Sequence, residues 1–116
     1  MSTYTNNVNI YEYLDYKKFL TAKIKEGSKV RGFQTRMAKT AKCQKSYLSQ
    51  VLRTKYHITT DQAFRLTQFF NFSALETDYF IELVNFARTD LAPLKERILV
   101  RLTSIKESST NLRIRP

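Results

Sequence analysis

Six polar side chains lie within one short predicted helix, from about residue 44 to residue 54, and none of them is a carboxylate. They are Gln44, Lys45, Ser46, Ser49, Gln50 and Arg53. A Gln amide can bond both N6 and N7 of adenine, and a Lys or Arg side chain can reach O6 and N7 of guanine. The chemistry that these residue types permit together is hydrogen bonding to base edges in a DNA groove, and we predict all six as base contacts.

Basic residues surround this stretch. No Asp or Glu occurs between Glu26 and Asp61, whereas eight cations do: Lys29, Arg31, Arg36, Lys39, Lys42, Lys45, Arg53 and Lys55. The whole chain holds 20 Lys and Arg against 10 Asp and Glu, a net charge of +10. Such an excess indicates a polyanionic partner, either nucleic acid or an anionic membrane surface. A solvated basic surface is the alternative, although solvated helix faces usually carry both charge signs.

A second set of residues is expected to touch phosphates rather than bases. It consists of Gln34, Thr35, Arg36, Lys39, Lys42 and Lys55. The first three open the preceding predicted helix, where free backbone N–H groups also favour anions. The three lysines would add contacts by charge alone, which position a protein on DNA without reading its sequence.

Groups for catalysis or metal binding do not gather anywhere in the sequence. The chain has one cysteine, Cys43, and one histidine, His57, so it offers no internal disulfide and no Cys/His metal set. No Gly-rich phosphate loop or Ser/Cys–His pairing occurs. We therefore predict no enzyme activity, no metal, no cofactor and no small-molecule ligand. Cys43 is expected to face inward at a turn, and His57 to have either a loop role or a place close to phosphate.

Helices are expected to position these groups, because the sequence has only two glycines and two prolines and its apolar residues recur at helical spacing. Residues 10–14 form a predicted turn, followed by helices over 15–27, 33–41 and 44–54. Three further helices are expected to begin near Thr59, Ser73 and Pro93. No stretch alternates convincingly with the period of a strand. The predicted fold is all-α, a compact bundle of five to six helices.

Polar residues mark where several of these helices begin. The pairs with capping-box spacing are Asn9 and Glu12, Thr59 and Gln62, and Ser73 and Glu76. Asp15 is a second candidate N-cap for the first long helix, and Asp90 with Pro93 is expected to start the last one. These signals predict the first turns of the helices more sharply than periodicity alone does.

The same patterns divide the chain. Residues 1–9 are predicted to be a flexible arm, 10–107 a single helical DNA-binding domain, and 108–116 a basic tail. No apolar run reaches the about 18 residues of a membrane span, and the start of the chain does not resemble a signal sequence. A cytoplasmic, nucleoid-associated protein is therefore expected.

The aromatic residues of the second half are assigned to the core. They are Phe64, Phe69, Phe70, Phe72, Tyr79, Phe80 and Phe86. A surface on which the bases of a single strand stack is the alternative interpretation of the same series.

Residues 34–53 resemble the helix-turn-helix pattern of DNA-binding proteins. Ala38 provides the small residue that the close crossing of the two helices requires. The inward-facing positions are filled by Met37, Ala41, Cys43, Leu48 and Val51. The turn position is usually Gly because its φ is positive; here it is Lys42, which can adopt that conformation at a cost of roughly 1 kcal/mol.

With its flanking helices, the segment 34–73 is similar to the phage-repressor class (Cro-like, XRE). Two further segments, Ile10–Leu20 and Glu76–Val84, resemble the N-terminal module of a bacterial family of transcriptional regulators. The resemblance covers roughly residues 10–105. It implies that the 44–54 helix enters the major groove and reaches base edges with its N-terminal residues. A larger C-terminal domain usually follows in that family, so the chain is either a short member or the DNA-binding part of a longer regulator.

Modules of this class normally bind two half-sites about one helical turn apart, which favours a homodimer. The last predicted helix could close the core or pair with another copy, and its candidate interface residues are Leu94, Ile98, Leu102 and Ile105. We expect sequence-specific binding of double-stranded DNA by a transcriptional regulator. Two alternatives stay open: a protein-interaction module that keeps a repressor-like fold without DNA binding, and a non-specific nucleoid binder.

Overall fold

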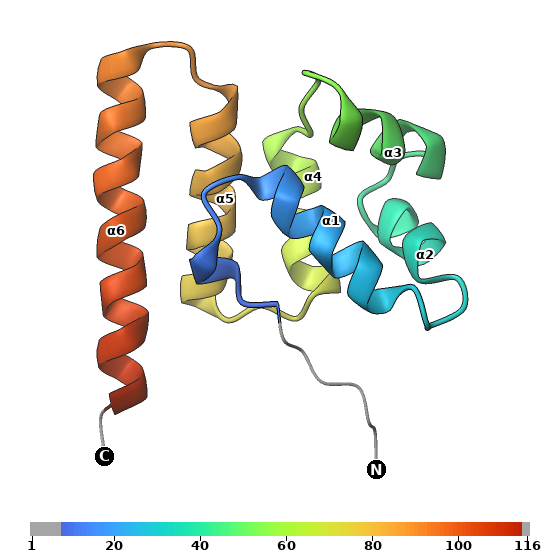
Figure 1. Cartoon of the computed structure of the whole chain (residues 1–116), viewed down its shortest axis with the longest axis horizontal. Coiled ribbons are helices and arrows are strands. Elements are labelled where there is room, and N and C mark those ends of the chain that lie inside the picture. Colours follow the sequence, from blue (N-terminus) through green and yellow to red (C-terminus); the bar gives the residue numbers. More distant parts are fainter. Residues whose placement is uncertain (1–7, 115–116) are drawn as a thin grey trace.

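The computed structural model describes residues 8–114, and every regular element among them is a helix (Figure 1). In chain order these are the short 3-10 helix η1 (Ile10–Glu12), α1 (Tyr16–Gly27), α2 (Phe33–Thr40), α3 (Lys45–Arg53), α4 (Thr60–Phe69), α5 (Ala74–Arg88) and α6 (Ala92–Ile114). The predicted all-α class is confirmed. The predicted flexible arm falls mostly on residues 1–7, and the end of the predicted tail on 115–116, all outside the described part.

The two capping boxes predicted for α4 and α5 are both formed. The Thr59 hydroxyl accepts from the Gln62 N–H (3.0 Å), and the Gln62 side chain accepts from the Thr59 N–H (2.9 Å). Ser73 and Glu76 make the same reciprocal pair at the start of α5, at 3.2 and 2.7 Å. Each box satisfies two N–H groups that would otherwise lack partners. Local sequence therefore sets where α4 and α5 begin.

The first turns of the molecule differ from the prediction in one detail. Asn9 caps η1, but its side chain accepts from the Tyr11 N–H (3.0 Å) rather than from that of Glu12. The Glu12 N–H already donates to the Asn9 carbonyl oxygen (3.1 Å), as a 3-10 turn requires, so the predicted capping box does not form. Asp15, the second candidate, caps α1 by accepting from the Lys17 N–H (2.9 Å).

Aromatic rings fill the centre of the core. The ring centroid of Phe19, on α1, lies 5.8–5.9 Å from those of Phe70, Phe72 and Phe80, a spacing at which edge-on aromatic pairs add to the free energy of burial. The other members of the predicted aromatic series are buried or half-buried, with one exception. Phe64 is 50% exposed, because it falls on the outer side of α4, and its assignment to the core was wrong.

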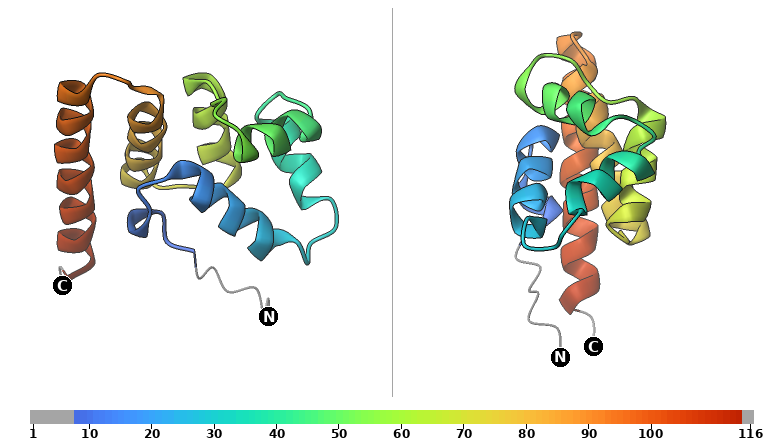
Figure 2. Two further views of the ribbon diagram at one scale, coloured as in Figure 1. Left: turned by 45° about the horizontal axis from the view of Figure 1, so that its top comes forward. Right: turned by 90° about the vertical axis from the view of Figure 1, so that its right-hand side faces the viewer.

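The molecule is a thin slab of about 40 × 38 × 19 Å. α5 lies in its middle and packs against α1, α4 and α6. α1 and α4 lie on opposite faces, while α2 and α3 form the end farthest from α6 (Figures 1 and 2). Between residues 8 and 114 no helix combines the length and the apolar character that a membrane span requires.

α6 is longer than predicted and closes one edge of the slab. It runs to Ile114, beyond the expected end of the domain at 107, because residues 108–114 contain no Gly or Pro to end it. Ile98 and Leu102 are only 4% and 1% exposed, and Ile105 is half-buried against the core. These residues therefore close the core against α5 within one chain. This corrects the candidate dimer interface, of which only Leu94 (42% exposed) stays open to solvent.

Candidate nucleic-acid interface

α2 and α3 pack against each other through the residues that the motif places inward. Met37, Ala41, Leu48 and Val51 are fully buried, and Ala38 is 2% exposed. The small side chain of Ala38 leaves room for the two helix backbones to approach. Burial of one face of each short helix matters, because helices of eight and nine residues are not stable alone in water.

The turn between the two helices has the positive φ that the sequence motif requires. Lys42 adopts φ 60°, and its N–H donates to the Lys39 carbonyl oxygen (3.0 Å) while the Cys43 N–H donates to that of Ala38 (3.0 Å). This pair of bonds is the Schellman motif that commonly ends helices. Cys43 is half-buried here, and burial raises the pKa of its thiol, so the group is held in its neutral form.

The predicted base-contacting residues lie along the outer side of α3. Five of the six are exposed to solvent: Gln44, Lys45, Ser46, Gln50 and Arg53. The sixth, Ser49, is half-buried and accepts a hydrogen bond from the Gln34 amide (Nε2 to Oγ, 3.1 Å). That bond joins the start of α2 to the middle of α3. Ser49 is therefore partly engaged within the chain, whereas the other five present their polar groups to solvent.

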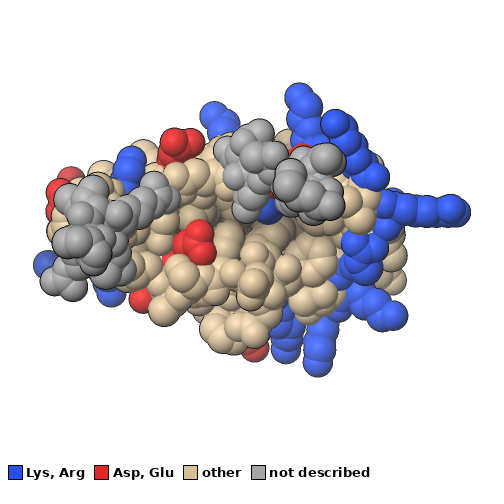
Figure 3. Space-filling model, turned by 90° about the horizontal axis from the view of Figure 1, so that it is seen from below, with Lys and Arg blue, Asp and Glu red and all other residues tan. Residues whose placement is uncertain are grey.

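The predicted phosphate-contacting residues lie around this face. Those that are exposed are Thr35, Arg36, Lys39, Lys42 and Lys55, while Gln34 is half-buried. The Arg36 guanidinium donates to the Arg31 carbonyl oxygen (2.8 Å), which orders its side chain beside the start of α2. Figure 3 shows Lys and Arg side chains gathered at the end of the molecule that holds α2 and α3. The structure thus brings both predicted sets to one basic end.

The loop that follows α3 is tied down by side chains from α1 and α5. Lys17 Nζ donates to the carbonyl oxygens of Thr54 and Tyr56, at 2.5 and 2.6 Å. Arg88 Nη1 donates to the Ile58 carbonyl oxygen, at 2.8 Å. These bonds join residues that are 30 to 39 positions apart in the chain. Sequence reasoning missed them, because no local pattern indicates a contact at such separations.

A buried tyrosine adds two more bonds to the same loop. The Tyr16 hydroxyl accepts from the Ile58 N–H (3.2 Å) and lies 2.9 Å from His57 Nδ1. Burial raises the pKa of Tyr16 to about 12, so its hydroxyl keeps its proton. Burial lowers the pKa of His57 below 6.5, and the nearby charges of Lys17 and Arg88 lower it further. A neutral His57 therefore faces a protonated hydroxyl, which can donate to Nδ1.

This end of the molecule offers hydrogen-bond donors and positive charge but no metal site. Among residues 8–114 no group of three or more His, Cys, Asp or Glu side chains could hold a metal ion. His57 lies in the loop after α3, as expected, and is half-buried against Tyr16. What the geometry can do chemically is to present amide, hydroxyl and cationic groups together on one exposed helix.

Comparisons with known proteins gave no match: no family model, no curated protein and no solved structure aligns with the chain. The resemblance to the phage-repressor class therefore stays a prediction that rests on residues 34–53 and the segments that flank them.

Proposed function

We propose that the chain binds double-stranded DNA in a sequence-specific manner and acts as a transcriptional regulator. In this proposal α3 lies in the major groove, and α2 crosses the sugar-phosphate backbone above it. One observation carries the proposal: the outer side of α3 exposes amides, hydroxyls and cations, with no carboxylate, at the basic end of the molecule. A carboxylate on that side would repel phosphate, whereas every group present can donate a hydrogen bond to a base or a phosphate.

The roles of individual residues follow from their chemistry. Gln44 and Gln50 are suited to adenine, and Lys45 and Arg53 to guanine. Ser46 can donate to several bases or to phosphate. The free N–H groups and side chains at the start of α2, together with the lysines around it, supply contacts that hold the module on the duplex without regard to sequence. A homodimer is part of the proposal, because paired modules read two half-sites of an operator.

Selection of bound duplexes from a random DNA pool tests the proposal. We expect an enriched palindromic sequence that binds about 10³-fold or more tightly than random duplex at the same salt concentration. Equal affinity for the selected and the random duplex would instead identify a non-specific nucleoid binder. Absence of any DNA binding at low salt would leave the protein-interaction alternative and overturn the proposal.

Four alanine variants separate base reading from charge. Gln44→Ala and Arg53→Ala should each lose about 1–3 kcal/mol of discrimination between the selected site and single-base mismatches. Lys39→Ala should weaken binding to all sequences about equally, because a phosphate contact reads no base. Arg97→Ala is the matched control, since it removes an exposed arginine from α6, far from this face. Unchanged mismatch discrimination in both Gln44→Ala and Arg53→Ala would exclude α3 as the reading helix.

A further inference from the structure

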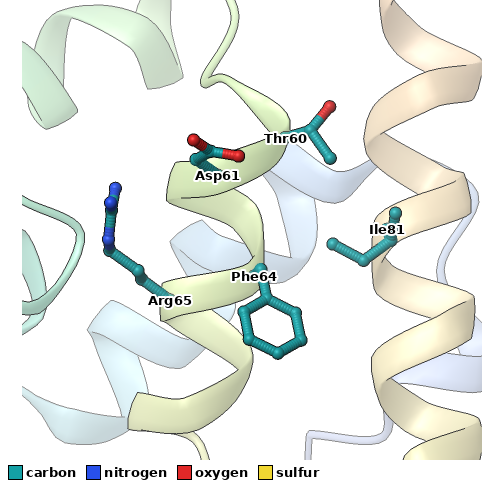
Figure 4. A pocket seen from close by; sticks show the side chains of 5 residues that line it. All are labelled: Thr60, Asp61, Phe64, Arg65 and Ile81. Atoms are coloured by element: carbon teal, nitrogen blue, oxygen red, sulfur yellow. The ribbon is translucent and has the colours of Figure 1, made fainter.

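A groove between α4 and α5 lies on the face of the molecule opposite to α1. It has a volume of about 360 Å³ and is lined by Thr60, Asp61, Phe64, Arg65 and Ile81 (Figure 4). The chain has eight phenylalanines, all of them in the described part, and Phe64 is the one whose side chain is exposed. At 50% exposure its ring keeps a large apolar area in water beside Ile81. Thr60, Asp61 and Arg65 border this apolar ring with polar and charged groups.

Two opposite charges flank the aromatic ring on the same helix. Asp61 and Arg65 are four residues apart on α4 and both line the groove. Between residues 8 and 114 the ion pairs join Lys23 to Glu26 and Arg101 to Glu82, so neither Asp61 nor Arg65 belongs to one. Figure 4 shows Phe64 on the side of α4 toward α5 and Arg65 on the side away from α5, with Asp61 on the facing side of the helix beside Thr60. The outer side of α4 therefore carries an acid, an apolar ring and a base in order along the helix.

We infer that this side of α4 binds a second copy of the chain, with α4 antiparallel to the α4 of that copy. A two-fold contact uses the same residues on both partners, so that residue i meets residue j and j meets i. An axis that passes near residue 63 places Asp61 of each copy opposite Arg65 of the other, and both ion pairs form at once. The same axis brings the two Phe64 rings together beside it. The charge pattern of α4 is thus complementary to itself when the helix is reversed.

The arrangement also suits two DNA-binding modules, and for this step it rests on the proposed function. The axis that reverses α4 is perpendicular to that helix and lies in the plane of the contact. Rotation about an axis does not change position along it. α2 and α3 lie beside α4, on the side away from α5 (Figures 1 and 4). Both copies therefore keep α2 and α3 toward the same end of the axis, as two half-sites on one side of a duplex require.

Sedimentation velocity on the unmodified chain and on charge-reversed variants tests the contact without DNA. In a dimer of the Asp61→Arg variant, both of the former ion pairs become arginine facing arginine. In a dimer of the Arg65→Asp variant, both become aspartate facing aspartate. We expect each single variant to dimerise at least about tenfold more weakly, since two attractive pairs become repulsive ones. A mixture of the two single variants should form a heterodimer, because both of its cross-pairs are then attractive. Glu96→Arg, a charge reversal on the exposed side of α6, is the matched control and should leave dimerisation unchanged.

The mixing experiment also guards against loss of folding, since unfolded variants would not recover dimers when combined. Phe64→Ala should weaken the dimer as well, at little cost in folding because the ring is half exposed. A chain that stays monomeric at all concentrations and binds DNA as a single copy would overturn the inference and the homodimer part of the proposed function, while leaving sequence-specific DNA binding through α3 intact. So would a dimer that neither charge reversal affects. A dimer with the expected charge pattern but no affinity for DNA would support the contact and overturn the proposed function.

Discussion

Two helices of this protein, α3 and α6, both expose a polar side to solvent, but the two sides differ in their charges. α3 exposes amides, hydroxyls and cations, together with the ring of Tyr47, and no carboxylate. The exposed residues of α6 carry both signs and include Glu96, Arg97, Arg101, Lys106 and Glu107. Mixed charge is what a solvated helix needs, since neighbouring charges of opposite sign stabilise it. A polar, basic composition is therefore not enough to distinguish α3 as a candidate DNA-binding helix. What distinguishes it is the absence of carboxylates on its outer side.

The two helices are also held in place differently. α6 packs its apolar side on α5 and makes an ion pair across the hairpin, from Arg101 Nε to Glu82 Oε2 (2.9 Å). α3 buries Leu48 and Val51, and the loop after it is fixed by hydrogen bonds from Lys17 and Tyr16 to the backbone. α6 thus depends on apolar burial, while the end of α3 depends on polar bonds of defined geometry. Four predictions, from the largest expected effect to the smallest, test this contrast.

The largest effect should be the response of DNA binding to salt. If α3 and its surroundings meet six to ten phosphates, affinity should fall by roughly 10³ to 10⁵ between about 50 and 200 mM salt. Lys39→Ala should lower the slope of log K against log salt by about 0.9, whereas Arg97→Ala on α6 should leave it unchanged. Fluorescence anisotropy titrations at several salt concentrations measure both slopes. Equal changes of the salt slope in the two variants would show that the cations around α3 contact DNA no more than those of α6 do.

The next largest effect concerns the packing of α6. Leu102→Ala should lower the free energy of unfolding by about 2–5 kcal/mol, because it leaves a cavity in the contact with α5. Val100, on the same helix, is 71% exposed, and Val100→Ala should change stability by no more than about 0.5 kcal/mol. Urea unfolding followed by circular dichroism gives both values. If Leu102→Ala were as stable as Val100→Ala, α6 would not pack on α5 in solution.

A smaller effect is expected at the turn before α3. Lys42 and Asn71 both adopt a positive φ, at 60° and 57°, and both follow a helix that ends in a Schellman motif. Asn tolerates this conformation better than Lys does. Lys42→Gly should therefore raise the free energy of unfolding by about 0.5–1 kcal/mol, and Asn71→Gly should raise it less. Thermal unfolding of the two variants decides the order, and the reverse order would contradict this account of the turn.

The smallest effect should be a pH dependence at His57. Its pKa is lowered by burial first and then by Lys17 and Arg88, against the opposing charges of Asp15 and Asp90. At His57 the unfolded chain therefore binds the proton more readily than the folded chain does. The contribution of neutral His57 to the free energy of unfolding is fully present above about pH 6.5 and is lost as the pH drops through the folded-state pKa.

A matched variant isolates this contribution from that of the carboxylates. His57→Asn keeps an acceptor near the position of Nδ1 but does not titrate. We expect the variant to lose less stability than the unmodified chain between pH 7 and pH 5.5, in urea unfolding at both values. An identical loss in the two proteins would show that protonation of His57 does not couple to folding.

The sequence was sufficient for most of the helices and for the location of the α3 face. The capping boxes at Thr59 and Ser73, the burial of Ala38 and the positive φ of Lys42 are all local features, and local features can be predicted from neighbouring residues. The exposure of Phe64 could not be predicted, because periodicity does not show which side of a helix other helices cover.

The bonds to the loop after α3 were also beyond sequence reasoning. Tyr16 and Ile58 are 42 residues apart, and only the packing of α1 brings them together. The continuation of α6 to Ile114 was missed for a different reason: a polar segment without Gly or Pro gives no local signal to choose between a helix and a tail.

The hydrogen bonds that hold the loop after α3 have a consequence for protein engineering. A designer who transplanted α2 and α3 alone onto another scaffold would leave behind Lys17 and Arg88, which donate to the loop carbonyls, and Tyr16, which accepts from the Ile58 N–H. The transplanted α3 would then end in a segment with free carbonyl groups and no fixed exit direction. A transplant must therefore include at least the run from Asp15 to Arg88, not the pair of short helices alone.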